Sequence, residues 1–265
     1  MSEIRVAVIG GTGVYNQSLI KDQEEITVDT RYGAVIMRAG TYKGRKVFFL
    51  ARHGGKHSVP PHMVNYKANI AALKYLEVNA IIATAAVGTL RQNMPPGSMV
   101  VIDQFIDFTK QRPLTFYEGA GNPVVHVDLS EPYCREVRRT ILNAGMALDL
   151  DLGDGGCYVC TEGPRFETPS EIRMIGQWGG DLVGMTNVPE VVLAREAGLC
   201  YAVIALPTNY AAGISSSPLT HEEVLEEMER VKPQLEKLLA ASVENIEHGY
   251  SCGCKEAGKY WSEES

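Results

Sequence analysis

Short apolar runs that end at glycine or another small residue constrain the fold of this 265-residue chain more than any other feature. Residues 80–86 (AIIATAA) form one continuous run that ends at a valine–glycine pair, and residues 5–9 form another that ends in the turn 10–13 (GGTG). Unbroken apolar runs are typical of strands that are buried on both faces. The same pattern predicts strands at 46–51, 98–103, 157–161, 182–185 and 200–206.

Segments with helical spacing of apolar residues separate these runs. They are predicted at 66–76, 131–144, 170–179, 189–197 and 220–248. Doubly buried strands that alternate with helices predict an α/β fold, with a mixed, largely parallel twisted sheet flanked by helices on both faces. No repeat or Pro/Gly-rich linker divides the sequence, so we expect a single domain over residues 1–249 and a peripheral polar tail at 250–265.

The charge balance narrows the classes of function. The chain has 25 basic and 32 acidic residues and a net charge of −7, so a general nucleic-acid-binding role is not expected. The N-terminal sequence lacks the basic region and apolar core of a signal peptide, and no stretch approaches the length of apolar sequence that spans a membrane. We therefore expect a cytoplasmic protein that does not contact a membrane.

The six cysteines contain two close pairs. Cys157 and Cys160 have the C-x-x-C spacing of redox and zinc sites, but they fall in a predicted strand, where they face opposite ways, and no second pair follows at zinc spacing. We expect them to be buried small hydrophobes. Cys252 and Cys254 form a C-x-C pair, either as a strained disulfide or as free thiols, and a reducing cytosol favours free thiols.

Candidate binding groups follow several of the predicted strands. The turn 10–13 exposes backbone N–H groups and a hydroxyl, Arg52 and His53 follow the strand at 46–51, and Met185 and Thr186 end another. Open α/β sheets bind ligands at the carboxyl ends of their strands, and a guanidinium suits the two-point recognition of phosphate. These residues predict a small-molecule anion site.

Longer motifs make the chain recognisable. They are VIGGTG at 8–13, ARHGGKH at 51–57, VNYKANI at 64–70, IDQFIDFT at 102–109, TEGPRFET at 161–168, MTNVPEVVLARE at 185–196 and ALPTNYAAG at 205–213. With them the chain resembles the trimeric purine nucleoside phosphorylases over residues 4–245, in particular the branch that includes methylthioadenosine phosphorylase. The resemblance implies the nucleoside phosphorylase fold and the cleavage of a purine nucleoside by inorganic phosphate.

The resemblance also implies a phosphate site. Its members would be Thr12, Arg52, His53, the backbone at Ala86, and Thr186. The family usually has a hydroxyl residue just before the alanine that matches Ala86, and here that residue is Ala85, so one phosphate contact is expected from backbone alone. Phosphate is a co-substrate, and neither a cofactor nor a metal is expected.

Three further residues are assigned by the resemblance. Met185 would lie against the ribose, Phe166 would pack on the purine ring, and His126 would be lent to the pocket of a neighbouring subunit. The family implies a homotrimer or a dimer of trimers.

Two departures from methylthioadenosine phosphorylase concern the purine. That enzyme has carboxylates in a D-Y-D segment, where this chain has Asn209, Tyr210 and Ala211. An asparagine amide donates to a 6-oxo oxygen and accepts from N7–H at the same time, which a carboxylate cannot do. Glu167 would accept N1–H, which 6-oxopurines have and adenine lacks. We expect Asn209, Glu167 and Arg52 to be catalytic, with inosine or guanosine as substrate.

The sugar preference depends on His221. A histidine there would hydrogen-bond a ribose 5′-hydroxyl, whereas methylthioadenosine phosphorylase is apolar at the matching position; a histidine at a helix N-terminus without a role is the alternative. An S-methyl-5′-thioinosine or methylthioadenosine phosphorylase is therefore an alternative within the class. A non-catalytic purine-binding regulator is the alternative outside it.

Overall fold

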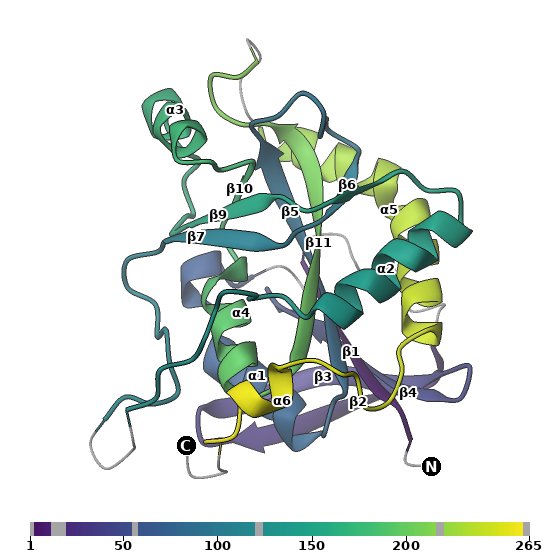
Figure 1. The fold of residues 1–265 in the computed structure, drawn as a ribbon. Helices are drawn as coiled ribbons and strands as arrows, with labels where there is room; N and C mark the ends of the chain where they lie inside the picture. The colour runs from purple at the N-terminus through teal and green to yellow at the C-terminus, as the bar shows by residue number, and fades with distance from the viewer. Residues whose placement is uncertain (1–2, 12–19, 55–57, 120–123, 216–219, 262–265) are drawn as a thin grey trace.

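The computed structural model describes residues 3–11, 20–54, 58–119, 124–215 and 220–261 (Figure 1). The strands are β1 (Arg5–Gly10), β2 (Lys21–Thr30), β3 (Gly33–Tyr42), β4 (Arg45–Ala51), β5 (Ala80–Thr89), β6 (Met99–Val101), β7 (Gln104–Phe108), β8 (Leu152–Asp154), β9 (Cys157–Thr161), β10 (Leu182–Gly184) and β11 (Cys200–Tyr210). The helices are α1 (Tyr66–Tyr75), α2 (Arg135–Ala147), α3 (Pro169–Gln177), α4 (Asn187–Glu196), α5 (His221–Glu244) and α6 (Cys254–Ala257), with a 3-10 turn at Pro61–Met63.

The strands form one mixed sheet around β5. The order is β2-β3-β4-β1-β5-β10-β9-β7, and β11 pairs with β5 and continues to β6 and β8. Parallel pairing joins β1 to β4 and β5, β5 to β11, and β9 to β7 and β10. The predicted mixed α/β sheet is confirmed.

Helices cover both faces of this sheet (Figure 1). Successive residues of β1 face opposite ways: Ala7 and Ile9 pack in one core with α1 and α4, and Val6 and Val8 pack in a second core with α2 and α5. Because each face buries apolar side chains, the central strands read as continuous apolar runs in the sequence. None of the helices in the described ranges combines the length and the apolar character that crossing a bilayer requires.

Two strands extend further than predicted. β5 reaches Thr89 and β11 reaches Tyr210, because the two pair in parallel along their length, with an irregularity between Pro207 and Asn209. Such a bulge accommodates a proline, which cannot donate to a strand ladder. Asn209 therefore lies on a strand, where the sheet holds its backbone.

The two close cysteine pairs lie apart from each other. Cys157 and Cys160 are both on β9; Cys160 is fully buried, as predicted for a small core residue, and Cys157 is half-buried. Cys252 precedes α6 and Cys254 begins it, and Cys254 is buried in the core beside α2 and α5.

Candidate functional site

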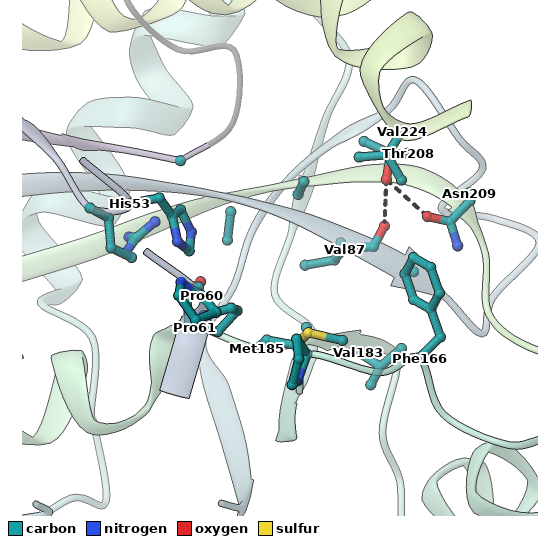
Figure 2. A pocket seen from close by; sticks show the side chains of 18 of the residues that line it. His53, Pro60, Pro61, Val87, Phe166, Val183, Met185, Thr208, Asn209 and Val224 are labelled. Carbon is teal, nitrogen blue, oxygen red and sulfur yellow. Dashed lines mark hydrogen bonds between the residues drawn. The ribbon is translucent and has the colours of Figure 1, made fainter. Parts of the chain in front are cut away.

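A local gap in the sheet creates the site. Along one edge, β5 pairs with β1 as far as Ala83 and with β10 from Gly88 onward. Within the described ranges, residues 84–87 of β5 have no strand partner on that edge, while β11 pairs with the other edge throughout. Such a change of partner is where open α/β sheets bind ligands. A pocket of about 410 Å³ opens at this gap (Figure 2).

Most of the predicted site residues line this one pocket. They are Arg52, His53, Ala85, Ala86, Phe166, Glu167, Met185, Thr186, Asn209 and Ala211. His126 does not line it and is exposed. Thr12 lies outside the described residues, as does the side chain of His221, although α5 begins at His221 and Val224, one turn later, reaches the pocket.

The Arg52 side chain is fixed within the wall of the pocket. Its guanidinium donates to both carboxylate oxygens of Glu190 at 2.7 Å and to the Thr84 carbonyl oxygen at 3.0 Å. Burial acts to lower the pKa of Arg52, but the adjacent Glu190 carboxylate outweighs burial, and the pKa rises above its ordinary value. An arginine has five N–H groups, so two remain for an anion once the contacts within the described chain are counted.

Glu190 was not identified from the sequence. It lies in the first turn of α4, is fully buried, and also accepts a hydrogen bond from the Tyr201 hydroxyl at 2.7 Å. The signal that could have revealed it is a carboxylate within an otherwise apolar helical segment, VPEVVLA, because a buried charge requires a partner. Glu190 orients Arg52, and it also neutralises much of that positive charge.

His53 and Thr186 complete this end of the pocket. The Nδ1 atom of His53 lies 2.8 Å from the Val59 carbonyl oxygen, which can only accept, so Nδ1 carries the proton and the ring is fixed. Thr186 is the N-cap residue of α4, and its side chain does not cap the helix. Thr186 lines the pocket, and its hydroxyl can donate to an anion there, whereas the helical backbone of α4 is interrupted at Val188.

Asn209 lies at the other end of the pocket (Figure 2). Its Nδ2 donates to the Tyr210 carbonyl oxygen at 2.9 Å, and its Oδ1 accepts from the Thr208 hydroxyl at 2.9 Å. Because the Tyr210 carbonyl can only accept, these contacts set the orientation of the amide. One N–H and one lone pair are not engaged by described residues, so the amide can donate and accept side by side.

Phe166 lies near Asn209, with Met185 toward His53 (Figure 2), and Glu167, the next residue after Phe166, also lines the pocket. The Thr161 hydroxyl donates to Glu167 Oε1 at 2.6 Å. Burial raises the pKa of Glu167, and this hydrogen bond opposes the rise. Phe166 lines the pocket and is 41% exposed, so part of its ring is accessible for stacking. The pocket thus has one end that suits an anion and another end that suits a heteroaromatic ring with hydrogen-bonding groups at its edge.

Residues 5–244 match the family model described as the phosphorylase superfamily. The chain belongs to the phosphorylase superfamily. This membership confirms the family resemblance of the motifs, and it makes the pocket at the β1–β5–β10 gap the candidate active site of a phosphorylase.

Individual relatives cover nearly the whole chain. A probable 6-oxopurine nucleoside phosphorylase of Moorella thermoacetica is 52% identical over 97% of this chain and 99% of the relative. A probable S-methyl-5′-thioinosine phosphorylase of Methanothermobacter thermautotrophicus is 48% identical over 95% of this chain and 88% of the relative. The solved structure of methylthioadenosine phosphorylase from Schistosoma mansoni in complex with adenine has a TM-score of 0.90 at 33% identity, covering 97% and 96% of the two chains.

Proposed function

We propose that this member of the phosphorylase superfamily is a purine nucleoside phosphorylase that cleaves 6-oxopurine nucleosides. Inosine or guanosine would react with inorganic phosphate to give the free base and ribose 1-phosphate. The observation that carries the proposal is one pocket with an anion-binding end around Arg52 and an amide at Asn209 that can donate and accept at the other. The name of the Moorella relative agrees with it.

The proposed chemistry needs positioning and electrostatic stabilisation. Phosphate, held by Arg52, His53 and Thr186, attacks C1′ from the face opposite the purine, and the C1′–N9 bond breaks with its electron pair leaving on the base. The ribosyl centre passes through an oxocarbenium-like state. Thr12 is proposed to add a hydroxyl contact to phosphate. No cofactor or metal enters the proposed reaction.

Discrimination between purines is assigned to Asn209 and Glu167. The spare N–H of the Asn209 amide donates to O6, and the Glu167 carboxylate accepts N1–H. As the C1′–N9 bond breaks, the leaving base takes up a proton from solvent at N7, and the spare lone pair of the amide accepts the new N7–H. Adenine has no O6 acceptor and no N1–H. Each buried polar group left unpaired costs about 1–3 kcal/mol, so two mismatches give discrimination against adenosine of about 100-fold or more.

Phosphate dependence is the direct test of this proposal. We expect release of hypoxanthine from inosine in phosphate buffer, with equimolar ribose 1-phosphate, and none in a phosphate-free buffer of equal ionic strength. If no nucleoside releases its base in a phosphate-dependent way, the regulator alternative replaces the enzyme.

The name of the Methanothermobacter relative favours a second candidate, S-methyl-5′-thioinosine phosphorylase. It would share the contacts to the 6-oxopurine and differ only at the 5′-substituent. Comparing kcat/KM for inosine and methylthioinosine separates the two. We expect His221→Val to shift that ratio toward methylthioinosine, and an unchanged ratio would remove His221 from the sugar site.

The raised pKa of Glu167 predicts a pH effect. Glu167 accepts N1–H only when it is ionised, and burial raises its pKa above the ordinary value of 4.5. The kcat/KM for inosine is therefore expected to fall as the pH drops through that raised pKa. Glu167→Gln, which cannot titrate, should have a lower kcat/KM without this acid limb, and the same limb in both profiles would contradict the assignment.

Assembly and location are also proposed. His126 is exposed and does not line the pocket of its own chain, which agrees with the proposal that it serves a neighbouring subunit of a homotrimer or of a dimer of trimers. We also propose a cytoplasmic location, which suits an acidic chain with a net charge of −7.

A further inference from the structure

Four cysteines from distant parts of the chain meet at one point. The sulfur atoms of Cys134, Cys200, Cys252 and Cys254 all lie within 4.8 Å of one another. Three of these residues are buried and Cys252 is half-buried. None of the four lines the active-site pocket, so the phosphorylase proposal does not explain the cluster.

The backbone brings these sulfurs together. Cys134 is the N-cap residue of α2, and its backbone N–H donates to the Tyr201 carbonyl oxygen at 2.8 Å. Tyr201 directly follows Cys200, the first residue of β11, so this hydrogen bond holds Cys134 beside Cys200. The chain after α5 passes beside the start of β11 and supplies the other two cysteines, with Cys252 before α6 and Cys254 as the first residue of α6 (Figure 1).

Glycine contacts fix this C-terminal segment. A Cβ atom on Gly258 would lie 2.3 Å from the Gly198 Cα atom, so the backbones of the two segments touch just before β11 begins. No residue with a side chain fits at Gly258 without moving that backbone. The positions of Cys252 and Cys254 relative to Cys200 are therefore set by the fold.

We propose that Cys134, Cys200, Cys252 and Cys254 bind one zinc ion in a tetrathiolate site. Zinc binds four thiolates in a tetrahedron with Zn–S distances of about 2.3 Å, which places neighbouring sulfurs about 3.8 Å apart. The sulfurs of Cys200 and Cys252 are 3.5 Å apart, near this spacing, whereas a disulfide bond is about 2.05 Å long. Two disulfides could also gather four sulfurs, but all four of these cysteines are free thiols in the structure, and one metal ion shared by them accounts for the convergence.

The surroundings suit the negative charge of such a site. Four thiolates around one zinc ion carry a net charge of −2, and binding releases the thiol protons. Nη1 of Arg195 lies 3.5 Å from the Cys254 sulfur as a hydrogen-bond donor. Cys134 is at the positive end of the α2 dipole, which stabilises a thiolate.

The proposed zinc has a structural role. Four protein ligands leave no open position for water or substrate, which distinguishes structural from catalytic zinc. The ion would tie the C-terminal segment, including α6, to the first residues of α2 and β11. The proposal is independent of the reaction in the pocket, because none of the four cysteines is among the residues that line it.

Metal content tests this proposal on the untagged, full-length protein purified without chelator. We expect one zinc per subunit by elemental analysis. Replacing zinc with cobalt should produce thiolate-to-cobalt charge-transfer bands and the d–d absorption of tetrahedral cobalt. Cys252→Ser should lose stoichiometric zinc and the tetrathiolate spectrum. Cys157→Ser is the matched control, because Cys157 is also half-buried but lies outside the cluster, and it should keep both.

Thiol counting separates zinc from disulfides. In denaturant with chelator and no reductant, the zinc site predicts six titratable thiols per chain. Fewer than six, with no zinc bound, would show disulfides and overturn the proposal, as would six thiols in a protein that binds neither zinc nor cobalt. If Cys252→Ser fails to fold, the zinc content and cobalt spectrum of the unsubstituted protein still decide.

Discussion

Glu190→Gln is expected to lower the free energy of unfolding by about 3–5 kcal/mol, the cost of leaving a buried charge without its partner. The Arg52 and Glu190 side chains are 1% and 0% exposed, and two hydrogen bonds of 2.7 Å join them. Glutamine has the same shape but turns an N–H group toward the guanidinium, where only an acceptor fits. The loss should appear as a lower urea midpoint at fixed protein concentration.

Glu171→Gln is the matched control for this prediction. Arg165 and Glu171 form the same two-point contact at 2.8 and 2.7 Å, but their side chains are 62% and 36% exposed. Water and salt screen that pair, so its loss should be a small fraction of the loss at Glu190. Equal losses for the two variants would show that burial does not set the strength of the Arg52–Glu190 pair.

The central sheet was predictable, and its polar edge was not. The runs that became β1, β4, β5 and β11 are apolar because both faces of these strands are buried. The hairpin of β2 and β3 was missed. The edge strand β2 (KDQEEITVDT) is largely exposed and has two successive glutamates, whereas β3 does bury alternate residues, at Val35, Met37 and Ala39. An edge strand buries too little to leave a clear alternation in the sequence.

Residues at strand ends were easier to identify than residues that act through pairing. Arg52, His53 and Thr186 follow strands, so the strand-end rule and the family motifs both pointed to them. Glu190 is in a helix, and its role depends on contacts with Arg52 and Tyr201 that only the folded chain creates.

The cysteine cluster also could not be predicted from the spacing of residues along the sequence. The C-x-C pair is visible in the sequence, but its two further partners, Cys134 and Cys200, are each isolated by many residues. A search for zinc motifs by spacing therefore found no second pair. Only the meeting of α2, β11 and the C-terminal segment places the four sulfurs together.

Asn209→Asp is expected to move the base preference from 6-oxopurines toward 6-aminopurines. A carboxylate cannot donate to O6 and repels it, whereas it accepts from the 6-amino group of adenine. The loss of one buried contact corresponds to about 1–3 kcal/mol, so kcat/KM for inosine should fall about 10–100-fold. The ratio of inosine to adenosine turnover, measured at one phosphate concentration, should fall with it.

Asn209→Ala separates repulsion from simple loss of contact. Alanine removes the donor and the acceptor together but brings no charge toward O6, so it should weaken the turnover of inosine without favouring adenosine. Glu167, whose carboxylate is held by Thr161, remains in both variants to accept N1–H, which limits the selectivity change to the amide position. An inosine-to-adenosine ratio that stays the same in Asn209→Asp would mean that this amide does not select the base, because no other change in the pocket could compensate for a donor lost at O6.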